Sequence, residues 1–234
     1  MSGTQLTLDL GHRPAFGRDD FLVAPCNFEA VAWMERWPDW PAHGLAVFGP
    51  PGCGKSHLLS VFAAAHAPEP VALLTADGID PAAVPGLVEA NRVVLVDDLD
   101  SLCGLAEETT LLHLHNLARE QGRFLMIAGR QPPSRLKLAL PDLSSRLNAL
   151  PAVGIGAPDD EVLSSLMIKL FADRQLEVGA EVVEFLVKRL DRSFAAIGAA
   201  VAALDAASLA ARRRVTVPLA RQYTLSRLAG EAQP

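Results

Sequence analysis

The sequence predicts an α/β domain with a doubly wound, mostly parallel sheet, followed by a smaller domain made only of helices. A glycine-rich loop joins an apolar run at 45–48 to a helical pattern at 57–66. A second apolar run, at 93–96, ends in two aspartates, and the pattern after Pro158 is purely helical. Strands that alternate with helices are typical of a parallel sheet covered on both faces.

Composition places the chain among globular proteins. It has 234 residues, 50% of them apolar, which is enough to bury a substantial core. No apolar run reaches the ~20 residues that a membrane helix needs, and the N-terminus lacks the layout of a secretion signal. The three cysteines form no C-x-x-C pair, so neither a disulfide framework nor a zinc site is expected. We therefore expect a cytoplasmic protein with no membrane partner.

The charge of the chain argues against direct DNA binding. Its formal net charge is −6, whereas proteins that grip DNA phosphates usually present a basic face. The one basic run, 212–214, ends an alanine-rich helical pattern, where cations suit the helix dipole. A protein partner is therefore expected in place of sequence-specific DNA.

The strongest local signal is the phosphate-loop pattern at 49–56, which reads GPPGCGKS and matches G-x-x-x-x-G-K-[ST]. Gly52 and Gly54 can adopt backbone angles that let amide hydrogens surround phosphates. Lys55 brings positive charge to the outer phosphates, and Ser56 offers a hydroxyl to Mg²⁺. The start of the following helix adds partial positive charge. The predicted nucleotide-binding residues here are Gly49, Pro50, Pro51, Gly52, Cys53, Gly54, Lys55, Ser56 and His57.

The two aspartates after the run 93–96 complete the expected Mg²⁺ site. Asp97 emerges at the carboxyl end of a strand, where ligands of an open parallel sheet bind. It would hold Mg²⁺ through water, together with Ser56. Asp98 is a candidate catalytic residue that polarises an attacking water. The alternative for Asp98 is a strand-end or helix-cap carboxylate.

Further elements complete the pattern. The expected elements are strands at 70–75, 123–128 and 152–156, and helices at 107–121, 181–190, 194–211 and, in short form, within 215–228. Asp159 can cap the first helix of the second domain. The apolar residues of that helix share one face, namely Val162, Leu163, Leu166, Met167 and Leu170.

Several stretches resemble one branch of the AAA+ proteins, the bacterial initiator DnaA and its relatives. GKSHLL resembles the family's GKTHLL, VVLVDDLDSLCG its Walker B segment, and LHLHNLAREQGR its FHxFNxL helix. The resemblance runs from about residue 21 to about residue 228. It implies an AAA+ P-loop base at 13–157, a helical lid at 158–234, and ADP or ATP with Mg²⁺ as cofactors.

The resemblance also assigns two arginines. LPDLSSRLNAL resembles the segment that carries the arginine finger, which acts on a neighbour's nucleotide, and this places the catalytic role on Arg146. A surface pair with Asp142 is the alternative. KRLDRSFAAI resembles the lid segment with the sensor-2 arginine, which places nucleotide contact on Arg192, and a pair with Asp191 is the alternative.

Two departures from the family pattern bear on function. Arg130 stands where relatives carry the sensor-1 aspartate, so the resemblance implies nucleotide binding more firmly than hydrolysis by this chain. The sequence also ends at Pro234 without the helix-turn-helix that DnaA uses to read the origin. These features favour an Hda-type regulator, which inactivates DnaA by promoting hydrolysis of its bound ATP.

The segment 5–10, QLTLDL, fits the Q-L-x-L-x-L motif by which such regulators bind the sliding clamp of DNA polymerase III. The resemblance places clamp contacts on Gln5, Leu6, Leu8 and Leu10, in a flexible tail at 1–12. Taken alone, the alternation also suits an edge strand.

The resulting expectation is a negative regulator of replication initiation that is ADP-bound, tethered to the clamp and directed at DnaA, with a homodimer as a further assembly. The alternatives are a helicase loader or other DnaA-like ATPase acting on single-stranded DNA, and a stand-alone enzyme such as a small-molecule kinase. A loader would need a basic channel with aromatic side chains, and Tyr223 is the only tyrosine.

Overall fold

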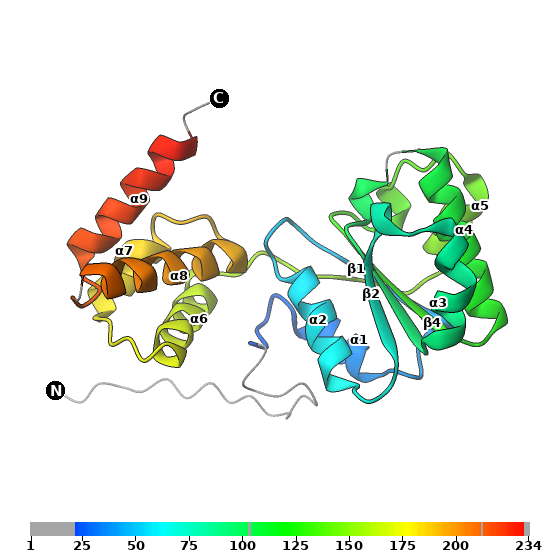
Figure 1. Cartoon of the computed structure of the whole chain (residues 1–234), viewed down its shortest axis with the longest axis horizontal. Helices are drawn as coiled ribbons and strands as arrows, with labels where there is room; N and C mark the ends of the chain where they lie inside the picture. The colour runs from blue at the N-terminus through cyan, green and yellow to red at the C-terminus, as the bar shows by residue number, and fades with distance from the viewer. Residues whose placement is uncertain (1–21, 103, 212, 232–234) are drawn as a thin grey trace.

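The computed structural model of the chain describes residues 22–102, 104–211 and 213–231. Figure 1 shows an α/β base beside a bundle of helices. The base holds a five-stranded sheet in the order β2-β3-β4-β1-β5, and every neighbouring pair is parallel. The strands are β1 (Gly44–Phe48), β2 (Val71–Thr75), β3 (Val93–Asp97), β4 (Phe124–Gly129) and β5 (Ala152–Gly154). The predicted fold class is confirmed, although β5 is shorter than the predicted strand at 152–156.

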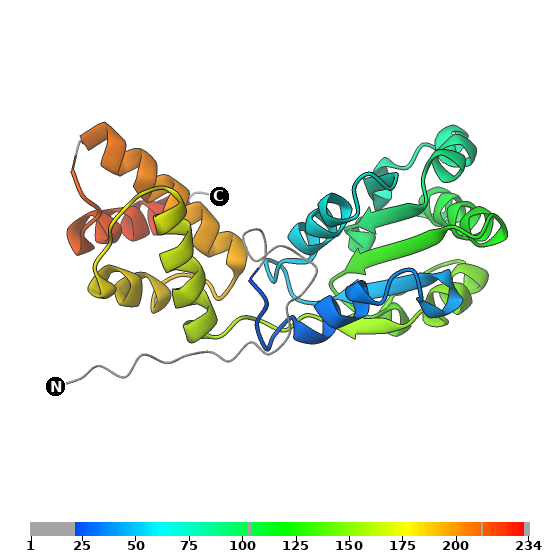
Figure 2. The ribbon, with the colours of Figure 1, turned by 90° about the horizontal axis from the view of Figure 1, so that it is seen from below.

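Helices cover both faces of the sheet, and Figure 2 gives a second view of these layers. The helices α1 (Phe28–Glu35) and α2 (Lys55–Ala65) share a core with Leu45 and Val47 of β1. Ala46 points the other way and packs with α3 (Val84–Ala90), α4 (Leu105–Glu120) and α5 (Pro141–Asn148). This division follows from the strand, whose successive side chains point to opposite faces.

The helices α1, α3 and α5 were not predicted from the sequence. Each has only seven or eight residues. Helices of this length are marginal in isolation and form because their apolar face packs on a core. Two turns are too short a stretch for a helical pattern to stand out from the surrounding sequence. One of the three, α5, contains Arg146.

The C-terminal bundle has a core of its own. It contains α6 (Asp160–Asp173), α7 (Ala180–Val187), α8 (Phe194–Ala211) and α9 (Val217–Glu231). The predicted cap is present, since Asp159 Oδ1 accepts a hydrogen bond of 2.8 Å from the Val162 amide. The predicted helix at 181–190 ends earlier, at Val187, and the expected short last helix is instead 15 residues long. Within the described residues, no helix is both long and apolar enough to cross a membrane.

Candidate nucleotide site

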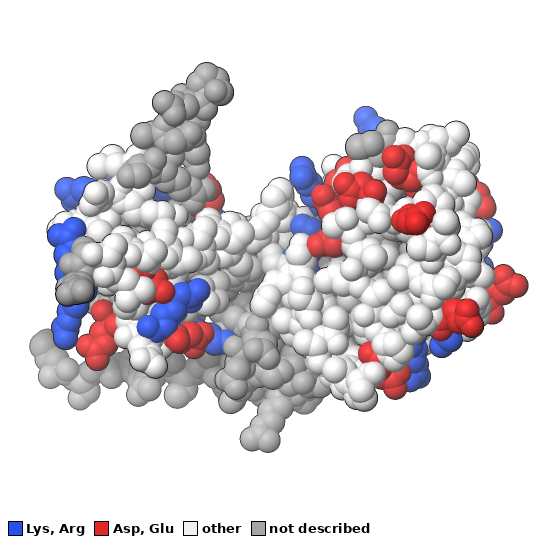
Figure 3. Space-filling view, viewed as in Figure 1, with Lys and Arg blue, Asp and Glu red and all other residues white. Residues whose placement is uncertain are grey.

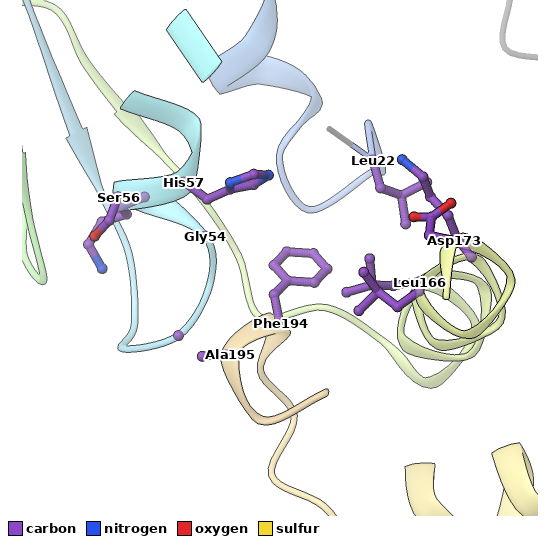
Figure 4. A pocket seen from close by; sticks show the side chains of 12 residues that line it. Leu22, Gly54, Ser56, His57, Leu166, Asp173, Phe194 and Ala195 are labelled. Carbon is purple, nitrogen blue, oxygen red and sulfur yellow. The ribbon is translucent and has the colours of Figure 1, made fainter. Parts of the chain in front are cut away.

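A cavity of about 540 Å³ lies between the phosphate loop and the helical bundle. Figure 4 shows side chains from both bodies facing it. Its lining residues are Leu22, Gly52, Gly54, Lys55, Ser56, His57, Leu166, Lys169, Leu170, Asp173, Phe194 and Ala195. The loop side supplies backbone amides and charge, and the bundle side supplies mainly apolar surface. Such a mixture suits a ligand with a charged end and a flat apolar end.

The glycines of the loop hold conformations that other residues resist. Gly52 and Gly54 have φ of 72° and 100°, in the left-handed region, and Gly54 directly precedes α2. A Cβ at Gly52 would also lie 2.6 Å from the Cβ of Ser193, in the turn before α8. The loop therefore needs glycine for its turn and for the close approach of the second body.

Lys55 is the first residue of α2, and its ammonium lies inside the loop. Its Nζ donates hydrogen bonds of 2.7 Å to the Gly49 carbonyl and 3.0 Å to the Pro50 carbonyl. The remaining contact is a weak one of 3.9 Å to Cys53 Sγ. An ammonium has three donors, so a phosphate oxygen can replace the sulfur contact. Burial raises the pKa of the Cys53 thiol despite the opposing charge of Lys55, so the sulfur remains a neutral group.

The acidic side of the site lies two strands away from the loop, because β4 separates β1 from β3. The Asp97 carboxylate is half-buried at the end of β3 and accepts a 2.8 Å hydrogen bond from the Asp98 amide. Asp98 is exposed, has a left-handed φ of 49°, and makes no capping hydrogen bond to the short helix Leu99–Ser101. The cap alternative for Asp98 is therefore not supported.

Carboxylate and hydroxyl oxygens are the ligands that Mg²⁺ prefers, usually one or two from protein beside phosphates and water. Ser56 at the start of α2 and Asp97 at the end of β3 fit that donor set. Across the described ranges, no group of three or more histidine, cysteine or acidic side chains could hold a metal by itself. A metal here would thus depend on the phosphates for its remaining ligands.

A third acid, Asp100, was missed by sequence reasoning. Its Oδ2 accepts a short hydrogen bond from the Arg130 amide, directly after β4. The Gly49 amide also donates to the Gly129 carbonyl, at 3.2 Å, which ties the phosphate loop to the same strand end. A carboxylate thus reaches the strand end at Arg130, where the resemblance predicts an acid. The D-D-x-D spacing at 97–100 was the available signal.

The lid side of the cavity differs from the prediction for Arg192. This residue lies in the turn before α8, and it lines a neighbouring hollow with Pro51 and Gly52 instead of the cavity. Its guanidinium is 66% exposed and lies 3.1 Å from Asp160, an ion pair that sequence reasoning did not anticipate. A lid cation that does line the cavity is Lys169 of α6.

Arg146 lies at the opposite edge of the sheet. It sits on α5, which leads into the start of β5, whereas the phosphate loop follows the end of β1. Glu108 of α4 positions this segment, because its buried carboxylate accepts hydrogen bonds from the Ala139 and Leu140 amides. The Nε of Arg146 lies 3.2 Å from Asp142 Oδ1, so the predicted alternative pair is present.

Comparison with known proteins gives a family match for the lid and a fold likeness for the whole chain. Residues 159–224 match the family model of the Hda lid domain. The chain is similar to domain III of the replication initiation protein DnaA of Thermotoga maritima, with a TM-score of 0.75 and 21% identity over 93% of this chain and 96% of that one. The chain therefore carries a lid of the Hda type and shares the AAA+ fold of DnaA domain III.

Two further solved structures are similar to the chain at lower sequence identity. AMPPCP-bound DnaA from Aquifex aeolicus matches with a TM-score of 0.69 and 19% identity over 82% of this chain, which spans 65% of the Aquifex chain. A single-residue variant of Thermotoga maritima RuvB matches with a TM-score of 0.66 and 14% identity, covering 90% of this chain and 69% of that one. At these identities the likeness concerns the AAA+ fold.

The predicted site residues thus fall into four groups. The loop residues and His57 lie around the cavity between base and lid, or next to it, and Asp97 and Asp98 end β3 on the same edge of the sheet. Arg146 lies at the opposite edge of the sheet. Arg192 lines the hollow that it shares with Pro51 and Gly52 of the phosphate loop. The clamp-motif residues 5–10 are outside the described residues. The lid's contribution from α6 was not predicted, because it depends on how the lid docks.

Proposed function

We propose that this AAA+ protein is a cytoplasmic negative regulator of replication initiation that binds ADP and stimulates hydrolysis of ATP bound to DnaA. The observation that carries the proposal is the place of Arg146. It lies at the amino-terminal edge of the parallel sheet, whereas the phosphate loop lies at the carboxyl-terminal edge.

This separation supports the proposal that Arg146 acts on another protein's nucleotide. The five residues of β1 span roughly 16 Å at ~3.3 Å per residue. An arginine side chain on the far edge does not cross that distance through a packed sheet. A guanidinium that meets developing phosphate charge on a neighbour can raise hydrolysis by ~10³-fold or more.

In this proposal, the protein's own nucleotide controls how the base and the lid are oriented. The Phe194 amide of the lid donates a 2.9 Å hydrogen bond to the Gly52 carbonyl of the loop. A nucleotide in the cavity would contact both bodies and so set the angle between them. Arg130 stands in place of the sensor-1 acid, which favours holding a bound nucleotide over hydrolysing ATP. Ser56 and Asp97 would hold its Mg²⁺, and Arg192 would approach the phosphates from the hollow beside Gly52.

Charge distribution supports a protein client. On the face in Figure 3, acidic side chains gather on the base, and lysine and arginine lie in small separate groups. A continuous basic stripe would favour a loader on single-stranded DNA. We propose that the motif at 5–10 supplies the tether, as an extended peptide bound to the sliding clamp through Gln5, Leu6, Leu8 and Leu10.

The test is turnover of ATP bound to DnaA in the presence of this protein, ADP and the DNA-loaded clamp, with each component omitted in turn. Stimulation should require all three. Deleting residues 1–12 should weaken stimulation at low protein concentration and leave ADP binding unchanged. Turnover that does not respond to this protein would contradict the proposal.

A further inference from the structure

A second pocket, which no prediction anticipated, surrounds Arg146 at the amino-terminal edge of the sheet. Its volume is about 570 Å³. It is lined by basic side chains from three separate elements: His43 from the turn before β1, His115 and Arg119 from α4, and Arg146 from α5. Asp142 is the one acid among its lining residues. We call these residues the cation pocket, after the arginine and histidine side chains that line it.

Two buried polar atoms of the cation pocket have no hydrogen-bond partner within the described part of the chain, namely His115 Nδ1 and Arg146 Nε. His115 is only 7% exposed. Although Arg146 Nε lies 3.2 Å from Asp142, its N–H does not point at the carboxylate well enough for a hydrogen bond. Buried donors and acceptors are nearly always satisfied, so these two atoms, from two elements at one pocket, are available to hydrogen-bond a ligand that enters it.

The charges around the pocket favour an anion. Burial lowers the pKa of His115, and the positive charges of Arg146 and Arg119 lower it further. A side-chain hydrogen bond with Asn116 and the negative charge of Asp142 act in the opposite direction. The positive charges of the two arginines also attract a negative ligand. Arg119 is exposed, so its guanidinium can reach a ligand at the mouth of the pocket.

The backbone at the rim is strained at two consecutive residues. Ala42 and His43 have φ of 54° and 55°, in the left-handed region that non-glycine residues rarely adopt. The His43 ring packs at 5.3 Å from the ring of Phe124. Strain of this kind persists only where surrounding structure enforces it, and it concentrates at binding sites.

We propose that the cation pocket binds the terminal phosphate of a nucleotide, with Arg119 as a second binding residue beside Arg146 and with His43 and His115 as further hydrogen-bond partners. The nucleotide is the ATP held on DnaA, and this part rests on the function proposed above. Asp142 holds Arg146 until the phosphate arrives, since a doubly charged oxyanion competes well with one exposed carboxylate for a guanidinium.

The site itself is tested with pyrophosphate and the full chain carrying isotope-labelled histidine. The imidazole resonances of His43 and His115 report the cation pocket, and that of His57 reports the nucleotide cavity in the same spectrum. Pyrophosphate should shift the first two. Arg119→Ala and Arg146→Ala should each weaken that response by about tenfold, the value of one charged hydrogen bond, and leave the His57 response unchanged.

Arg92→Ala is the matched control, because Arg92 is a partly exposed arginine of the base that pairs with Glu69. It should change neither response. The site is refuted if His43 and His115 stay unmoved at pyrophosphate concentrations that saturate His57, or if neither Arg119→Ala nor Arg146→Ala weakens their response.

The source of the phosphate is tested by turnover of DnaA-bound ATP with the Arg119→Ala variant. A loss of about tenfold supports the partner's nucleotide as the ligand. Unchanged turnover beside lost pyrophosphate binding overturns that source. If the unmutated protein fails to stimulate DnaA but pyrophosphate still shifts His115, the proposed function fails and the phosphate site stands.

Discussion

The nucleotide cavity and the cation pocket have nearly the same volume, about 540 and 570 Å³, but very different linings. The cavity combines glycines of the phosphate loop with apolar side chains such as Leu166, Leu170 and Phe194. The cation pocket has arginines and histidines and no large apolar side chain among its described lining residues. The first can enclose a whole nucleotide, whereas the second suits only the phosphate end of one.

This difference follows from the parallel sheet. The carboxyl ends of its strands gather the loop and the acids at one edge, where a helix begins and its dipole favours phosphate. The opposite edge offers no such backbone site, so anion binding there depends on side chains. In the proposed function, the two edges therefore serve two different nucleotides, one held by this protein and one presented by a neighbour.

The largest expected effect comes from Arg146→Ala. Stimulated hydrolysis of DnaA-bound ATP should fall by ~10³-fold, because the charge that meets the transition state is removed. Binding of ADP, measured by fluorescence titration, should be unchanged, since the two sites lie on different edges. Arg92→Ala is the control. Equal loss of ADP binding in Arg146→Ala would show that the two sites are not separate.

Next in size is Lys55→Ala, which acts on the other edge. Removing the ammonium should weaken ADP binding by roughly 10- to 100-fold, the usual range for a charged hydrogen bond to phosphate. The response of His115 to pyrophosphate should remain. Lys188→Ala, at an exposed pair with Glu184 in the lid, controls for loss of charge. A parallel loss of the His115 response would contradict independent sites.

A smaller effect is expected for Arg192→Ala. This side chain is largely exposed and paired with Asp160, so its removal should change the free energy of unfolding by less than about 1 kcal/mol. If it reaches the nucleotide from the hollow beside Gly52, affinity for ADP should fall about tenfold. Calorimetric titration with Lys169→Ala alongside would decide which lid cation contacts the ligand.

The smallest effect is a pH dependence of stability through His115. Burial lowers its pKa in the folded protein below the usual 6.5, so the unfolded chain binds more protons at mildly acidic pH. Stability due to neutral His115 is present above pH 6.5 and is lost as the pH falls through the lowered pKa. Measured by urea unfolding, the free energy of unfolding of the unmutated protein should fall more steeply with decreasing pH than that of His115→Gln. Identical slopes would contradict the burial of an uncharged imidazole.

Local features of the fold could be predicted because neighbours in sequence produce them. The phosphate loop, the strand that ends in Asp97 and the cap at Asp159 each depend on residues a few positions apart. The short helix α5 was missed because its stability comes from Leu143 and Leu147 packed on the sheet. The pairing of Arg192 with Asp160 was missed for a similar reason, since lid packing joins residues far apart in the chain.

By itself, the sequence determined the α/β base, the nucleotide loop and the helical lid, because each has a periodic or spaced pattern within one segment. Only the tertiary structure decided which side chains share a pocket. Asp100 reaches the Arg130 amide across 30 positions, and His43, Arg119 and Arg146 come from three elements that meet at one sheet edge. Such meetings depend on strand order and helix packing, which no local pattern encodes.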